Sequence, residues 1–334
     1  MTIHWYPGHM HKAQKDMIEL LPQVDLLIEI LDARIPWSSE NPAIARLRGD
    51  TPCIKVLSKS DLADPAVTAL WQARFEQQRN VKTFPTRSDQ PAGIKALQGL
   101  CREMVPQRDA NKNQIHAMVV GIPNVGKSTL INILAGRKIA RTGDEPAVTK
   151  SQQRIDLGND IILFDTPGIL WPKVENPASS YRLAVTGAIR DTAMEYDDVG
   201  HFAAEYLLRH YPDLLVERFK LDALPRDEEA FLQAAAIKRG AIGTGGKFNR
   251  HKISELLVKE FRSGILGRIS LETPAMIAAE RIELDKAAAR QQAEDKAARK
   301  QRFKEGSGSL DKKERKEVRV DERAARKPKS TPKR

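Results

Sequence analysis

Short apolar runs alternate with glycine-rich or polar segments in the first half of the chain. Residues 51–57, 115–120 and 161–164 are such runs, and their length and composition predict strands that are buried on both faces of a sheet. Residues 129–135 follow the second run and predict a helix that ends at Gly136. Strands that alternate with helices in this way indicate an α/β fold with a sheet rich in parallel strands.

The second half of the chain shows a different period. From residue 178 to about 278 the apolar positions recur at helical spacing, and prolines separate the predicted helices. One stripe shows the spacing well, with Val199, Phe202, Ala203, Tyr206 and Leu207 on one face. We therefore expect an α/β domain over residues 1–177, with a helical segment at 11–21, followed by a small all-α domain over residues 178–280.

The segment between the second apolar run and its helix matches the phosphate-loop pattern G-x-x-x-x-G-K-[S/T] at residues 121–128. The glycines of such a loop let backbone N–H groups surround phosphates at the positive end of a helix. Lys127 is expected to reach the β- and γ-phosphates, and Ser128 is expected to bind Mg²⁺. Other loop residues expected at the nucleotide are Asn124, Val125, Gly126 and Thr129.

The run at 161–164 ends in the sequence D-T-P-G. Asp165 can hold the hydration shell of Mg²⁺, and the N–H of Gly168 can contact the γ-phosphate. The polar, turn-rich segment 141–150 lies between the two motifs and is expected to be a mobile switch. Thr149 is the expected second hydroxyl for Mg²⁺, and Thr142 is the alternative.

The strand at 51–57 leads into Ser58-Lys59-Ser60-Asp61, which resembles the N-K-x-D base-recognition motif of GTPases with serine in place of asparagine. A carboxylate at Asp61 can accept hydrogen bonds from N1 and N2 of guanine, which adenine does not offer, and Lys59 would lie along the base. The loss of the asparagine amide, which usually braces the phosphate loop, predicts weaker binding of the base. Thr86 lies in a segment expected to contact guanine O6 through its backbone. For residues 58–61, an ordinary turn at the strand end is the alternative to base recognition.

Base recognition therefore precedes the phosphate loop, and this order resembles that of circularly permuted GTPases. With the N-terminal sequence Trp5-Tyr6-Pro7-Gly8-His9-Met10, it resembles the ribosome biogenesis GTPase A (YlqF-type) family over roughly residues 1–280. The resemblance implies that His9 positions the attacking water, since the apolar Ile169 after D-T-P-G cannot; a helix-capping role is the alternative. It also implies that Asn124 binds K⁺ beside the phosphates. The alternative is that this asparagine only makes a local turn.

The family resemblance implies a circularly permuted P-loop GTPase domain followed by a small all-α domain. It implies a cytosolic monomer, with GTP as substrate and Mg²⁺ as cofactor, that matures the precursor of the large ribosomal subunit and contacts its rRNA. Slow GTP hydrolysis would rise on the particle and depend on K⁺. An RNA-binding chaperone with a vestigial GTP site is the alternative, and an ATP-dependent kinase or ATPase is a third possibility.

Charge is concentrated at the C-terminus. The chain has a net charge of +11, and residues 281–334 hold 19 Lys and Arg against 10 Asp and Glu. We expect a basic tail that is partly helical, then disordered, and that attracts a polyanion; a merely solubilising tail is the alternative. A basic loop is expected to face RNA phosphates, or else to be a solvated loop, and its residues are Lys238, Arg239, Lys247, Arg250, His251 and Lys252.

The remaining composition narrows the compartment. The two cysteines, Cys53 and Cys101, cannot form a disulfide framework, and Cys53 lies in a predicted core strand. No apolar stretch approaches the length of a membrane span, and no leader is recognisable. These features predict a cytoplasmic protein with no membrane partner.

Overall fold

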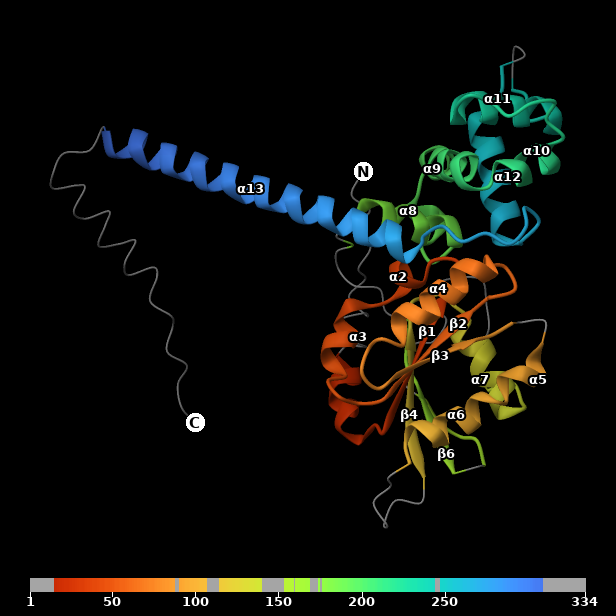
Figure 1. Cartoon of the computed structure of the whole chain (residues 1–334), viewed down its shortest axis with the longest axis vertical. Helices are drawn as coiled ribbons and strands as arrows, with labels where there is room; N and C mark the ends of the chain where they lie inside the picture. The colour runs from red at the N-terminus through yellow and green to blue at the C-terminus, as the bar shows by residue number, and fades with distance from the viewer. Residues whose placement is uncertain are drawn as a thin grey trace. The chain divides into compact units, whose positions relative to one another are not determined.

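The computed structural model describes residues 15–87, 90–106, 114–139, 153–158, 160–168, 174, 176–243 and 247–308 (Figure 1). The chain forms two compact units, residues 1–277 and 278–334.

The described residues of the first unit form a six-stranded sheet with the strand order β3-β2-β1-β4-β6-β5. The strands are β1 (Leu26–Asp32), β2 (Cys53–Ser58), β3 (Val81–Pro85), β4 (Ile115–Gly121), β5 (Gln153–Asp156) and β6 (Ile161–Asp165). All neighbours pair in parallel except β5, which pairs antiparallel with β6. The predicted parallel-rich α/β sheet is confirmed, but its central strand β1 was not predicted.

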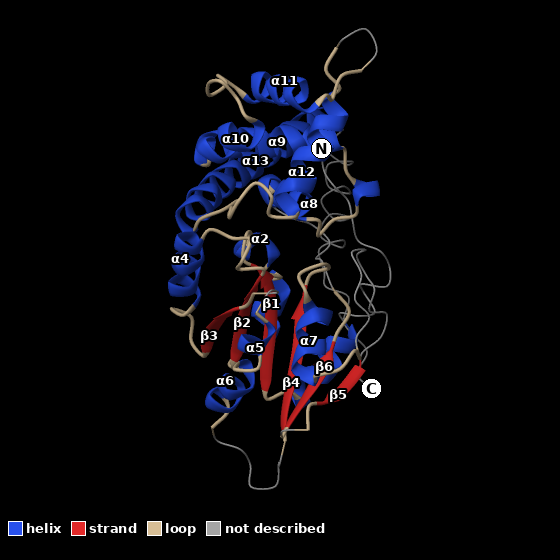
Figure 2. Cartoon of the chain, turned by 90° about the vertical axis from the view of Figure 1, so that its right-hand side faces the viewer, coloured by secondary structure: helices blue, strands red, loops and turns tan. Residues whose placement is uncertain are grey.

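Helices cover both faces of this sheet (Figure 2). The helices beside the strands are α2 (Pro36–Ser39), α3 (Pro42–Leu47), α4 (Pro65–Phe75), α5 (Pro91–Ile94), α6 (Leu97–Met104) and α7 (Lys127–Ala135), with a 3-10 turn η1 (Leu21–Gln23) before β1. Residues 15–20 are helical, within the predicted N-terminal helix. Alternate side chains of β1 enter two different cores: Ile28 packs in the same cluster as Leu130 of α7, and Leu27 in the same cluster as Trp71 of α4. Burial on both sides explains why β1 is apolar almost throughout.

The predicted helices of the second half are also present. They are α8 (Pro177–Thr186), α9 (Tyr196–His210), α10 (Pro212–Phe219), α11 (Glu228–Arg239) and α12 (Arg250–Arg262), with a 3-10 turn η2 (Asp191–Ala193) before α9. Side chains fix several starts; Asn176 accepts a hydrogen bond from Ala178 N at α8, and Asp227 from Ala230 N at α11. The division of the chain at residues 177 and 280 stays a prediction.

Helices α9 and α12 cross at very close range. A Cβ at Gly200 would lie 2.3 Å from Cβ of Ser254, so only glycine allows this approach. On the predicted stripe of α9, Val199, Ala203 and Leu207 are buried in the core shared with the sheet. The helical segment and the sheet therefore share one hydrophobic core.

The described part of the chain ends in a long helix, α13 (Pro274–Gly308) (Figure 1). Its described side chains from Glu283 onward are mostly exposed, and Lys286 pairs with Glu283 at 2.8 Å. The predicted helical start of the basic tail is confirmed, while the predicted disorder falls in residues 309–334, outside the described part. Among the described helices, none is both long and apolar enough to cross a membrane.

Both cysteines are free thiols in the core. Burial raises the pKa of Cys53 and of Cys101 to about 12, so neither is a reactive nucleophile.

Candidate nucleotide-binding site

The predicted motifs meet at one edge of the sheet. Strands β2, β4 and β6 run parallel, so their carboxyl ends bring Ser58, Gly121 and Asp165 to the same edge, with β1 between β2 and β4. Ligands of open parallel sheets bind beyond such strand ends. The reversed order of the motifs along the chain is thus no obstacle to a common site.

Glycine is required at two places in the phosphate loop. A Cβ at Gly121 would lie 2.6 Å from the carbonyl oxygen of Ile30 in the neighbouring strand. Gly126 has a φ of 94°, in the left-handed region, and α7 begins at the next residue. Asn124 is also left-handed, with a φ of 59°. This succession of turns is the geometry that directs backbone N–H groups into an anion site.

Lys127 lies beneath the loop and beside Gly168. Its Nζ donates to the carbonyl oxygens of Gly121 at 3.2 Å and Ile122 at 3.0 Å. Burial lowers the pKa of Lys127 to about 8, although the nearby charge of Asp165 opposes this shift. A Cβ at Gly168 would lie 2.9 Å from Nζ of Lys127 and 3.0 Å from N of Pro123, so the D-T-P-G segment packs directly on the phosphate loop.

Asp165 is a buried carboxylate with unmet capacity for ligands. Neither of its side-chain oxygens accepts a well-formed hydrogen bond from the described residues. Burial raises the pKa of Asp165 to about 6, against the lowering influence of Lys127 and of the amide of Thr166.

These oxygens suit a hard cation such as Mg²⁺, which prefers oxygen ligands and keeps several waters. Ser128 supplies a hydroxyl at the start of α7, but Thr149 lies outside the described residues. The described part of the chain holds no cluster of three or more His, Cys, Asp or Glu side chains that could hold a metal.

Ser58 contacts the phosphate loop directly. Its Oγ lies 2.6 Å from the carbonyl oxygen of Val125 and 2.9 Å from that of Leu31, and its single hydrogen serves these two acceptors. Lys59 donates to the carbonyl oxygen of Asn124 at 2.7 Å. The Ser58 hydroxyl therefore connects the base loop to the phosphate loop without the asparagine amide, while the predicted weaker binding of the base stays a prediction.

Asp61 and Thr86 lie on adjoining loops. Asp61 is half-buried. Ser60 donates to the carbonyl oxygen of Thr86 through both its N, at 3.0 Å, and its Oγ, at 2.9 Å. The N–H of Thr86 already donates to the Leu57 carbonyl at 2.9 Å, so the backbone of Thr86 holds the loops together. The O6 contact predicted there stays a prediction.

One charged cluster at this edge was missed from the sequence. Asp32 ends β1 and accepts hydrogen bonds from Nε of Arg34 at 2.9 Å, Nη2 of Arg34 at 2.7 Å and Nζ of Lys59 at 3.1 Å. These cations hold the pKa of Asp32 well below its usual range, in spite of complete burial. An acidic residue directly after an apolar run was the available signal.

The phosphate loop also contacts the helical segment. Nδ2 of Asn124 donates to the carbonyl oxygen of Gly187, the residue that ends α8, at 2.9 Å. Arg262, at the end of α12, donates to the carbonyl oxygens of Ala184 at 2.8 Å and Val185 at 3.0 Å. The end of α8 therefore links the phosphate loop to α12.

A second buried polar cluster holds the start of α8. Glu272 is fully buried. Its Oε1 accepts a hydrogen bond from N of Ser38, and its Oε2 accepts one from Oγ of Ser38 and lies 3.6 Å from Nη1 of Arg182. The hydroxyls of Ser38 and Ser179 are also hydrogen bonded to each other, with their oxygens 2.8 Å apart. Burial raises the pKa of Glu272. The sequence offered no local signal for this cluster, which joins three distant segments.

The predicted RNA-facing loop is less cationic than its sequence suggests. Lys238 pairs with Asp222 at 3.3 Å, Arg250 with Glu229, and His251 lies 3.4 Å from Asp197. Lys252 is exposed. Several basic side chains of this loop thus have acidic partners within the protein.

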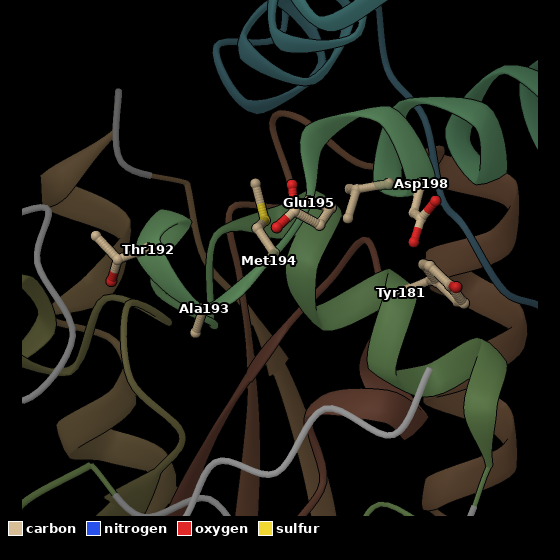
Figure 3. Close-up of a pocket in the computed structure, with 7 residues that line it drawn as sticks. Tyr181, Thr192, Ala193, Met194, Glu195 and Asp198 are labelled. Atoms are coloured by element: carbon tan, nitrogen blue, oxygen red, sulfur yellow. The ribbon is translucent and has the colours of Figure 1, made fainter.

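A cavity of about 280 Å³ lies between α8, η2 and α9 and shares no lining residue with the predicted nucleotide site (Figure 3). Its lining residues are Tyr181, Thr192, Ala193, Met194, Glu195, Asp198 and Val199. Glu195 and Asp198 flank the start of α9, where negative charge favours the helix. The acidic residues in the cavity wall are therefore explained by their place at the start of α9.

The fold and this edge define a class: a P-loop GTPase whose base-recognition segment precedes the phosphate loop. A family profile described as "50S ribosome-binding GTPase" matches residues 116–204. Ribosome biogenesis GTPase A of Bacillus pumilus is 41% identical over 281 residues, which cover 82% of this chain and 99% of that protein. The chain belongs to the ribosome biogenesis GTPase A family, and it hydrolyses GTP to GDP and phosphate.

More distant relatives agree. Mitochondrial ribosome-associated GTPase 1 of Xenopus tropicalis is 32% identical over 293 residues, covering 80% of this chain and 94% of that protein. A GDP-bound structure of TM YlqF superposes with a TM-score of 0.57 at 25% identity, over 78% of this chain and 99% of that one. The GNP-bound YlqF from T. maritima, 24% identical with a TM-score of 0.56 over 79% of this chain and 98% of that one, shows the same fold. His9, the predicted catalytic histidine, lies outside the described residues.

Proposed function

We propose that this protein is a GTP-hydrolysing assembly factor for the large ribosomal subunit, which binds pre-ribosomal RNA under the control of GTP. The observation that carries the proposal is the direct contact of the phosphate loop with the helical segment, through Asn124 and Gly187. The names of the relatives, which include ribosome biogenesis and ribosome association, support the ribosome as partner.

In this proposal the edge of the sheet binds GTP with its base near Asp61 and its phosphates in the loop 121–128. Lys127 leaves its two carbonyl acceptors and donates to the β- and γ-phosphates, and Gly168 offers its N–H to the γ-phosphate. Ser128, Asp165 and Thr149 would hold Mg²⁺, which stabilises the charge on the transferred phosphoryl group. His9 positions the attacking water.

Potassium would bind through Asn124. The donation from Nδ2 to Gly187 orients this amide, and an amide oxygen is the atom that suits a hard cation. A cation there would supply the positive charge that other GTPases take from an arginine. The proposed K⁺ dependence therefore ties hydrolysis to the same residue that touches α8.

The nucleotide state would reach the RNA-binding part through α8. Gly168 packs on the phosphate loop, and the chain enters α8 at Pro177, whose first turns contact Glu272 and Ser38. A change at the γ-phosphate would therefore move α8 between two fixed attachments. The net charge of +11 and the basic C-terminal region favour an RNA partner. We further propose that the protein acts as a monomer in the cytoplasm.

The test compares large-subunit precursor binding in GTP and in GDP for the wild type and for Lys127→Ala. We expect the GTP-dependent part of binding to vanish in Lys127→Ala and to persist in Lys259→Ala, a control that removes an exposed lysine paired with Glu255 on α12. Nucleotide-dependent binding by Lys127→Ala would refute the coupling. GTP turnover with and without particles, in K⁺ and in Na⁺, separates a working enzyme from a vestigial site.

A further inference from the structure

The loop that carries Asp61 is held from outside the sheet. Residues 264–270, which lead the chain back from α12 toward α13, lie along residues 60–64. A Cβ at Gly264 would lie 2.6 Å from Cδ2 of Leu62, so the two segments approach as closely as glycine allows. The sequence separation of these segments is about two hundred residues, and nothing in the phosphate-loop motifs requires their contact.

Arg268 makes the central contact. Its Nη2 donates to the carbonyl oxygen of Ser60 at 3.1 Å, and its Nε donates to that of Ala63, also at 3.1 Å. The two acceptors lie on either side of Asp61 and Leu62. The planar guanidinium has a fixed spacing between its donors, so it sets the separation and direction of both carbonyls.

Further hydrogen bonds complete the attachment. The N–H of Ile269 donates to the carbonyl oxygen of Leu62 at 2.9 Å, and the N–H of Asp64 donates to Oγ of Ser270 at 3.2 Å. The hydroxyl of Tyr211 lies 3.3 Å from Oδ2 of Asp64. Ser60, Leu62, Ala63 and Asp64 are therefore each tied by backbone or side chain to this segment, which fixes the backbone on both sides of Asp61.

We propose that Arg268 is a positioning residue for guanine selection, which fixes the backbone around Asp61 so that its carboxylate meets N1 and N2 of the base together. This inference rests on the proposed reading of guanine by Asp61. Two hydrogen bonds to one carboxylate need correct direction as well as distance, and a loop free to rotate would keep one of them at the expense of the other.

The experiment measures dissociation constants for GDP and for inosine diphosphate, which lacks the amino group that supplies the second hydrogen bond. In Arg268→Ala we expect the ratio of the two constants, inosine diphosphate over GDP, to fall by roughly threefold to tenfold. Arg268→Lys keeps the charge without the fork and should lower the ratio by less. A general loss of stability would weaken both ligands and leave the ratio unchanged.

Two further variants separate the possible failures. Arg209→Ala is the matched control, since it removes an exposed arginine that contacts Glu205 at 3.5 Å, and its ratio should equal that of the wild type. Asp61→Asn should lower the ratio strongly; an unchanged ratio there would overturn the guanine reading itself. A lowered ratio in Asp61→Asn with an unchanged ratio in both Arg268 variants would overturn only the role of Arg268.

Discussion

Two buried carboxylates end the strands on either side of β4, and their surroundings are opposite. Asp32 at the end of β1 accepts hydrogen bonds from Arg34 and Lys59, and these cations lower its pKa. Asp165 at the end of β6 accepts no well-formed side-chain hydrogen bond from the described residues, and burial raises its pKa to about 6. Two carboxylates with similar positions and similar burial thus differ in their partners: Asp32 has hydrogen-bond donors and cations around it, and Asp165 has few.

This difference indicates which of the two carboxylates can bind a ligand. Asp32 has its charges compensated within the protein, so its role is to hold β1 and the base loop in place. Asp165 stays costly until something outside the described chain compensates it, because a buried charge without partners is unfavourable. Substitutions at the two positions should therefore affect different properties of the protein.

The largest expected effect is on stability, in Asp32→Asn. This change leaves the buried guanidinium of Arg34 and the half-buried ammonium of Lys59 without their carboxylate, and we expect a loss of about 3–5 kcal/mol in the free energy of unfolding. Urea denaturation of the nucleotide-free protein measures it. Asp213→Asn, on the exposed side of α10, is the control, with less than about 1 kcal/mol expected. A loss at position 32 as small as that of the control would remove the contrast.

The next effect is on catalysis, in Asp165→Asn. We expect the rate of GTP hydrolysis at saturating Mg²⁺ to fall by about 100-fold, because the carboxylate that we propose as a ligand of the cation is gone. Stability at pH 7 should stay equal or rise, since the neutral amide avoids the cost of a buried charge. Turnover assays and urea denaturation of the same preparation check both halves. Full activity with reduced stability would show that Asp165 resembles Asp32 after all.

The dependence of stability on pH should have opposite signs at the two positions. The pKa of Asp165 is raised from 3.8 to about 6, so the folded state binds a proton more tightly, and stability falls by roughly 2 kcal/mol as the pH rises between these values. The pKa of Asp32 is lowered, so its stabilisation is present above pH 4 and is lost as the pH falls further. The free energy of unfolding from pH 3 to pH 7, compared with each Asp→Asn variant, gives both slopes. Two slopes of equal sign would contradict the assignment.

The smallest effect concerns Ser58, which ends β2 on the same side of the site as Asp32. Ser58→Ala removes the hydrogen bond to Val125 and should weaken GDP binding by about 1 kcal/mol, or roughly fivefold. Ser58→Asn restores a donor and, unlike Ser58→Ala, should bind GDP at least as tightly as the wild type does. Calorimetric titration with GDP measures both. Equal affinity in the wild type and in Ser58→Ala would mean that Lys59 alone braces the loop.

The local motifs could be predicted from the sequence because each is a contiguous pattern with a backbone consequence. The phosphate loop, the strand before Asp165 and the turn at Gly168 all follow from neighbouring residues. The central strand β1 was missed although residues 26–31 are nearly all apolar. Glu29 interrupts that run, and its burial makes sense only with Lys55, its register partner on β2, at 2.6 Å.

The rest of the site depends on contacts between distant segments. The brace from Ser58 to Val125, the cluster around Glu272 and the fork of Arg268 each join residues separated by many tens of positions or more. A single sequence contains the donors and acceptors but not their pairing. The serine at position 58 therefore looks like a loss in the sequence alone, whereas in the structure its hydroxyl reaches the Val125 carbonyl of the phosphate loop.

The attachment of residues 271 and 272 to the sheet also bears on how the protein is made. The N–H of Leu271 donates to the carbonyl oxygen of Arg34 at 2.8 Å, and the indole of Trp71 donates to that of Glu272 at 3.1 Å. The nascent chain therefore releases β1 and α4 long before their last partners leave the ribosome. Contacts of such separation slow folding, because a long loop must close first. The segment that holds Arg34 and Trp71 is therefore made only after all six strands of the sheet have been translated.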